Sequence, residues 1–244
     1  MALLHGAGPR LVGLSGNARM LSAALGEGSV LRAYDAAAPI GVVRQVVGLL
    51  GDRPFGYAPE DLARSSYDWA GARRIHEDIV AYKRTTPHGG LVLIGHSLGA
   101  AMAVDLVNRL ARQDIRIEEV LLLDRMFFEW RWGAFLGLRR RMHELAPRGA
   151  EHIEVLHEVL VHKESLPLRE RIWVSAPAGG HVPLPDEVAR RAGCRLLTWA
   201  PPEYGHGAVA WWPDPFQDIV RRRTGRAYSA TPQATSKNPA AFTP

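Results

Sequence analysis

The chain has 244 residues, of which 47% are hydrophobic and 23% charged, and this is enough apolar material to bury the core of one large domain. Its net charge of +5 would suit an anionic partner, but three positive charges stand together at residues 221–223 and no DNA- or RNA-binding motif is present, so we expect no nucleic-acid binding. The single cysteine, Cys194, excludes intrachain disulfides and sites with several cysteine ligands, while the lack of a signal-peptide pattern or a long apolar run predicts a cytoplasmic protein without a transmembrane segment.

Short apolar runs alternate with amphipathic helical patterns, which predicts an α/β protein with a mainly parallel central sheet. In chain order, the apolar runs predict strands over residues 11–14, 30–34, 91–94 and 120–123. Apolar side chains three and four residues apart predict helices over residues 18–25, from Ser65 or Ser66 to about Lys83, and from Leu98 onward.

The pattern changes after residue 126. Residues 127–165 are rich in aromatic side chains and arginine, and they predict two or three helices with no strand. His157 and His162 fall in this stretch five residues apart, which does not fit a zinc motif with histidines four apart, so we interpret them as polar positions on an amphipathic helix with Ile153, Leu156 and Leu160 on its apolar face. Strands are predicted at 172–174 and 196–199, a final helix ends after Ile219, and residues 224–244 have the composition of a disordered tail.

Gly95-His96-Ser97-Leu98-Gly99 stands between a predicted strand and a predicted helix, which is the context of a nucleophile elbow. The turn lifts the serine hydroxyl clear of the sheet, and side chains at the two glycines would collide with neighbouring backbone. The following helix directs its N-terminal N–H groups toward the site, where they would favour negative charge on an oxyanion. Ser97 is therefore the candidate nucleophile.

A serine nucleophile needs a general base and an acid that orients it, in the chain order serine, acid, histidine. Asp124 is our preferred acid because it ends the apolar run EVLLLD at the carboxyl end of a strand; Asp186, in VPLPDEV, is the alternative. His206 is our preferred base because it follows the last predicted strand and has a glycine on each side; His181 is the second choice.

Two backbone N–H groups should form the oxyanion hole. The first belongs to Leu98, the residue after the nucleophile, and the second to the loop after the first major strand. If that strand is 11–14, Gly16 or Asn17 supplies the second donor. The competing interpretation uses His-Gly-Ala-Gly at residues 5–8, and we prefer Gly16 and Asn17 because a helix and a strand follow them at short spacing.

The stretch LIGHSLGAAMAVDLVNRL followed by EVLLLD resembles the α/β-hydrolase superfamily, and is most similar to its lipase-like and thioesterase-like members. The 27 residues from Ser97 to Asp124 are similar to the separation in acyl thioesterase domains. The resemblance implies an α/β-hydrolase fold over residues 1–223, with 127–165 as a helical lid. Many hydrolases carry an aspartate in the Gly-x-x-Asp-x-x-Val-Pro stretch that follows a later strand; residues 179–183 here lack it, which favours Asp124.

The resemblance implies acyl transfer: an esterase, lipase or thioesterase that cleaves an ester or thioester through an acyl-enzyme, with no metal and no cofactor. A small acyl substrate, delivered free or on an acyl carrier, would be the partner. The alternatives are an acyltransferase that uses the same triad and a non-catalytic binding protein on the same fold. Four aromatic side chains are candidates to contact the substrate: Phe127, Phe128, Trp130 and Trp211.

Overall fold

The structure is a computed structural model that describes residues 2–5, 12–26, 32–35, 70–96, 98–124, 126–128, 147–161, 179–181, 190, 192–201, 204–205 and 208–225. These residues form an α/β fold around a six-stranded sheet in the order β2-β1-β3-β4-β6-β8, and every neighbouring pair is parallel. The strands are β1 (Ala2–His5), β2 (Arg32–Asp35), β3 (Val92–His96), β4 (Ile117–Leu123), β6 (Ile153–Val159) and β8 (Arg195–Trp199). A separate antiparallel pair joins β5 (Met126–Phe128) to β7 (Gly179–His181).

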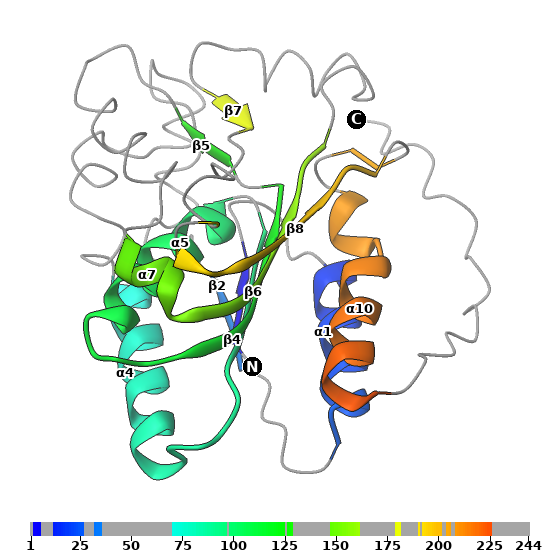
Figure 1. Cartoon of the computed structure of the whole chain (residues 1–244). Coiled ribbons are helices and arrows are strands. Elements are labelled where there is room, and N and C mark those ends of the chain that lie inside the picture. The colour runs from blue at the N-terminus through cyan, green and yellow to red at the C-terminus, as the bar shows by residue number, and fades with distance from the viewer. Residues whose placement is uncertain are drawn as a thin grey trace.

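Helices cover both faces of the sheet (Figure 1). α1 (Val12–Ala24) and α10 (Asp214–Thr224) lie side by side on one face, and α4 (Ala70–Thr85), α5 (Leu98–Ala111) and α7 (Pro147–Glu151) lie on the other. The short 3₁₀ helix η5 (Ala208–Trp211) precedes α10 and contacts α1. None of the helices described combines the length and the hydropathy that a bilayer span requires.

The central strands are buried because both of their faces are covered. All of β3 is buried, and in β4 only Glu118 is partly exposed, as expected for a parallel sheet between two helical layers. α5 buries Ala103, Val107 and Leu110, three and four residues apart, against the sheet. The structure confirms the predicted strands 91–94, 120–123 and 196–199. It also confirms the predicted helix that begins near Leu98 and the separate final helix that ends after Ile219.

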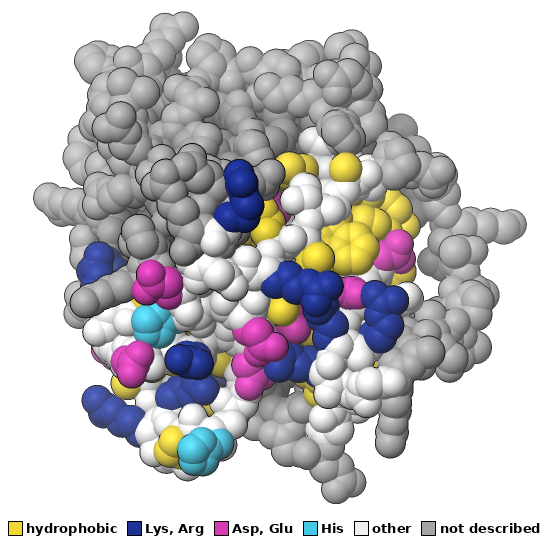
Figure 2. Space-filling view, in the orientation of Figure 1, with side chains coloured by type: hydrophobic (Ala, Val, Ile, Leu, Met, Phe, Trp, Pro, Cys, Tyr) yellow, Lys and Arg dark blue, Asp and Glu magenta, His cyan; other side chains and the backbone are white. Residues whose placement is uncertain are grey.

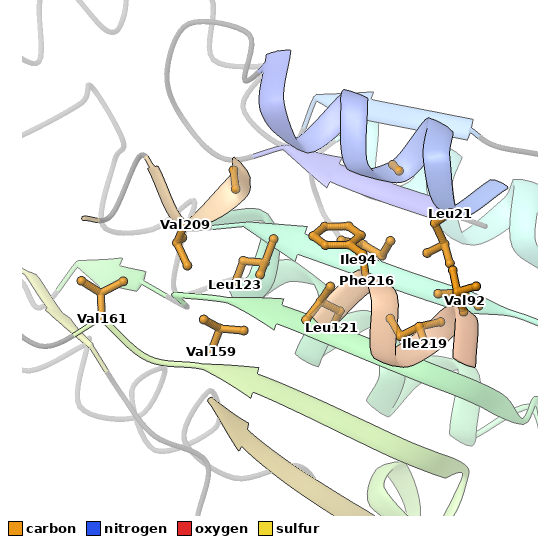
Figure 3. Packing of buried hydrophobic residues seen from close by; sticks show 13 residues of the cluster. Leu21, Val92, Ile94, Leu121, Leu123, Val159, Val161, Val209, Phe216 and Ile219 are labelled. Atoms are coloured by element: carbon orange, nitrogen blue, oxygen red, sulfur yellow. The ribbon is translucent and has the colours of Figure 1, made fainter. Parts of the chain in front are cut away.

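One hydrophobic cluster fills the layer between the sheet, α1, η5 and α10 (Figure 3). Leu21 of α1 and Phe216 and Ile219 of α10 pack over side chains of β3, β4 and β6. Val209 of η5 belongs to the same cluster, and Figure 3 shows it at the end of the sheet where β4 finishes with Leu123. η5 is therefore part of the core although it is a single short turn.

The same layer encloses charged groups at its other end. His157 of β6 and Glu119 of β4 are 0% and 1% exposed, and their Nε2 and Oε2 atoms lie 2.7 Å apart. Arg223, in the last turn of α10, lies within 3.4 Å of Glu118, Glu119 and Glu154. These ion pairs attach the carboxyl end of α10 to strands β4 and β6.

The expected strand at 11–14 was wrong: residues 12–24 form α1, and the first strand of the sheet is β1. A four-residue apolar run does not distinguish a strand from the first turn of a helix. Continued downstream, the spacing is helical, since Asn17, Ala18 and Leu21 share the buried side of α1.

The expected lid without strands was wrong at residues 153–159, which form β6 inside the main sheet. β-branched side chains recur at odd positions, Ile153, Val155 and Val159, and this strand period outweighs the helical spacing of Ile153, Leu156 and Leu160. His157 is therefore a buried strand residue. Residues 129–146 and 162–165 of the expected lid, the strand 172–174 and the tail beyond Gly225 lie outside the described residues.

Candidate functional site

The sheet has a topological switch point between β1 and β3. The chain runs from β1 outward to β2, whereas from β3 it runs in the opposite direction to β4, β6 and β8. In open parallel sheets of this kind, ligands bind outside the carboxyl ends of the strands at that point. β1 ends at His5 and β3 at His96, so the residues that follow these two positions are the first candidates for a site.

A single residue separates β3 from α5. The strand ends at His96 and the helix begins at Leu98, so the strand and helix predicted around Ser97 are both present; Ser97 itself lies outside the described residues. A Cβ atom on Gly95 would stand 2.6 Å from Ala100 Cα, 2.6 Å from Gly99 O and 2.7 Å from Ala100 N. The first turn of α5 thus rests directly on the backbone of the strand, which requires glycine at position 95.

Asp124 follows the neighbouring strand at the same edge. His96 of β3 is in register with Leu123 of β4, so Ser97 and Asp124 each come one residue after a paired position. Adjacent strands are about 4.8 Å apart, which brings the two chain segments close together. The predicted position of Asp124 at the end of a central strand is confirmed, while its role in catalysis remains a prediction.

The Asp124 carboxylate is enclosed by protein. The residue is 0% exposed, its N–H donates to the Val159 carbonyl at 2.8 Å, and its Oδ1 accepts a hydrogen bond of 3.3 Å from the Val161 N–H. Its φ of 44° lies in the left-handed region, where few residues other than glycine are found. Buried carboxylates need hydrogen-bonded or charged partners, so this position is suited to bind a cationic or N–H-bearing side chain.

The segment that carries His206 is located only through its neighbours, since His206 lies outside the described residues. Val209 donates its N–H to the Gly205 carbonyl at 2.9 Å, so a residue before position 206 and a residue after it are hydrogen-bonded to each other. Val209 and Ala210 are fully buried, and Val209 lies at the end of the sheet where β4 finishes (Figure 3). His181, the second choice, lies on β7 and is in register with Met126, two residues beyond Asp124.

Gly16 and Asn17 are not in a loop after a strand, as the oxyanion prediction required; they lie inside α1. Backbone N–H groups in a helix interior donate to carbonyls one turn back, so they are not free to bind an oxyanion. The Asn17 side chain instead donates its Nδ2–H to the carbonyl of Ala210 at 2.9 Å and, at 3.4 Å, to that of Trp212. No sequence pattern indicated this contact, because the helix here was expected to begin only at residue 18.

Aromatic side chains gather around η5 and the end of β8. Trp212 packs edge-on against Trp199 with ring centroids 5.7 Å apart and lies 6.0 Å from Tyr204, while Trp211 is 55% exposed. Figure 2 shows hydrophobic side chains collected on this part of the surface, above α10. Phe127 and Phe128 lie on β5, which contacts α5, and Trp130 lies outside the described residues.

Comparison with protein-family models and with curated proteins returns no match for this chain. Within the described ranges, no three His, Cys, Asp or Glu side chains are grouped as metal ligands would be. The described part of the site is a one-residue strand-to-helix junction at a switch point, with a buried carboxylate at the end of the adjacent strand.

Proposed function

We propose that this chain is a serine hydrolase of the α/β-hydrolase type, which cleaves a carboxylic ester or thioester through an acyl-enzyme on Ser97. The observation that carries the proposal is the junction between β3 and α5, where Gly95 touches helix backbone and one residue is left to make the turn. This is the strand–turn–helix context that a nucleophile elbow requires. Asp124, one residue after the Leu123 that pairs with His96, supports the same assignment.

In the proposed reaction, the Ser97 hydroxyl attacks the carbonyl carbon while His206 accepts its proton, and Asp124 holds the imidazole in the tautomer that can accept it. The tetrahedral intermediate collapses, and His206 returns the proton to the departing alcohol or thiol. Water then attacks the acyl-enzyme, again losing a proton to His206, and the acid product leaves as Ser97 regains its hydrogen. Neither a metal nor a redox partner is needed to balance these steps.

The oxyanion hole of this proposal uses the Leu98 N–H at the start of α5, which precedes the hydrogen-bonded ladder of the helix. The second donor now comes from the residues after β1, namely the Gly-Ala-Gly stretch at 6–8, because β1 adjoins β3 and ends at His5. Phe127, Phe128, Trp130 and Trp211 remain the proposed contacts for an acyl chain.

A fluorophosphonate probe, which reacts covalently with activated serines, tests the proposal. We expect labelling of the wild type and none of Ser97→Ala, with equal melting temperatures for the two proteins. Equal labelling of both would refute Ser97 as the nucleophile. His206→Ala and His181→Ala form a matched pair: loss of labelling in the first alone supports His206, and loss in the second alone transfers the role of base to His181.

A panel of activated esters and acyl-CoA thioesters of increasing chain length then defines the substrate class. Each reaction is run with and without an added alcohol or amine. Transfer of the acyl group to the added nucleophile in preference to water would identify an acyltransferase. A folded wild type with neither labelling nor turnover would identify a non-catalytic protein on this fold.

A further inference from the structure

We infer that Asn17 is a positioning residue that holds η5, the helix that begins two residues after His206, at the carboxyl edge of the sheet; the inference rests on the proposed function, in which His206 is the general base. Asn17 lies on α1, far from position 206 in the sequence, and its side chain is 5% exposed. In the described part of the chain, its side chain donates to the carbonyl of Ala210 in η5 and to that of Trp212 just after it.

The contact satisfies two backbone carbonyls at the carboxyl end of η5. The last carbonyls of a short helix are left without N–H donors, and burial makes each unpaired carbonyl costly. Ala210 is fully buried and accepts from Asn17 Nδ2 at 2.9 Å, while the Trp212 carbonyl lies 3.4 Å from the same atom. The asparagine amide of α1 thus caps η5.

The cap is transmitted to His206 through two short links. Trp212 donates its N–H to the Val209 carbonyl at 3.1 Å, and Val209 donates to Gly205 at 2.9 Å, so η5 and the turn before it form one hydrogen-bonded unit. Val209 anchors this unit in the core beside the end of β4. Because η5 begins two residues after position 206, a displaced η5 should also displace the histidine that the proposed function uses as base.

Asn17→Asp is the informative variant because it keeps the side-chain shape and removes the N–H donor. The carboxylate would also face two carbonyl oxygens, so η5 should move away. Asn17→Ala is the second variant; alanine is a better helix former than asparagine, which preserves α1. Leu21→Ala is the matched control, since Leu21 is 1% exposed on the same helix but Figure 3 shows it at the opposite end of the cluster from Val209.

We expect both Asn17 variants to lower kcat about 10- to 100-fold with little change in KM, as displacements near 1 Å do in active sites. The acidic limb of kcat/KM should move to lower pH, because an imidazole held less closely by a carboxylate has a lower pKa. Amide hydrogen exchange should become faster in a peptide that covers residues 205–212. Leu21→Ala should lower the melting temperature without changing kcat or the acidic limb.

Three results would overturn the inference. If the Asn17 variants melt at a lower temperature but keep the wild-type kcat and acidic limb, Asn17 serves stability alone. If hydrogen exchange at residues 205–212 is unchanged, Asn17 does not hold η5. If wild type and Ser97→Ala turn over esters equally, the proposed function fails and the positioning role fails with it; intact Ser97-dependent turnover separates the first two results from the third.

Discussion

Replacing Gly95 with alanine tests the strand-to-helix junction directly. The new Cβ would stand 2.6 Å from Ala100 Cα and from Gly99 O, whereas ordinary contacts begin near 3.4 Å, so the first turn of α5 has to shift by several tenths of an ångström or more. Ala100 N would be the third close atom, at 2.7 Å, and all three are backbone atoms that cannot rotate away. Overpacking of this kind destabilises a fold by about 1–3 kcal/mol, and we expect the upper end here.

A loss of about 3 kcal/mol corresponds to a fall of roughly 6–12 °C in melting temperature for a domain of this size. Ser97-dependent turnover should also fall about 100-fold, even at temperatures where the variant is folded, because the turn that carries Ser97 is expected to move with α5. Differential scanning calorimetry and initial rates, both compared with the wild type, measure the two effects.

Gly16→Ala is the control, because it makes the same chemical change where a Cβ meets nothing within 4 Å. Alanine is favoured over glycine inside a helix by roughly 0.5–1 kcal/mol, so the melting temperature should rise slightly and turnover should be unchanged. Equal melting temperatures and rates for Gly95→Ala and the wild type would show that α5 does not rest on β3 as the structure has it.

Three further outcomes concern buried charged groups and the thiol. Glu119→Leu breaks the buried contact with His157 and should reduce the free energy of unfolding by about 3–5 kcal/mol. The double variant Glu119→Leu/His157→Leu should lose less stability than the sum of the two single variants. Urea titrations that give strictly additive losses would contradict this coupling. Burial alone would raise the pKa of Asp218, but hydrogen bonds from Arg222 and Arg221 outweigh it and lower the pKa, so its contribution to stability is present above the ordinary aspartate pKa and is lost as pH falls through the lowered value. In Asp218→Asn the melting temperature should therefore fall less steeply with acidification. A dependence of melting temperature on pH like that of the wild type would contradict a stabilising role for the hydrogen bonds from Arg221 and Arg222. Burial raises the pKa of Cys194 to about 11, so the folded protein should resist alkylation at pH 8 while the urea-unfolded chain reacts; above the ordinary thiol pKa of 9.0 this group favours the unfolded state.

Elements with one dominant period were predictable from the sequence. The continuous apolar runs at β3 and β4 and the four-residue spacing in α5 each fit a single interpretation, and the structure has these elements at the expected places. The glycine requirement at position 95 also followed from the motif, since the steric reason is local to the turn. The position of Asp124 was predictable because the apolar run of β4 ends directly before it.

Elements with two compatible periods were not predictable. The start of α1 looked like a strand and β6 looked like a helix, because the apolar run in each is short and the deciding contacts come from neighbours distant in the sequence. The pairing of β6 with β4 and the cap that Asn17 provides to η5 are tertiary contacts of this type. The error at α1 also moved the expected oxyanion donors to Gly16 and Asn17, since residues 11–14 were taken as the first strand in place of β1.

The one-residue junction also limits how α5 can move relative to β3. A longer connection would allow independent hinge motion, but here strand and helix follow each other at once and Gly95 leaves no gap between them. The start of α5 can therefore move relative to β3 only when the axis of the helix moves with it. Any rearrangement that accompanies ligand entry therefore has to take place in segments other than the junction between β3 and α5.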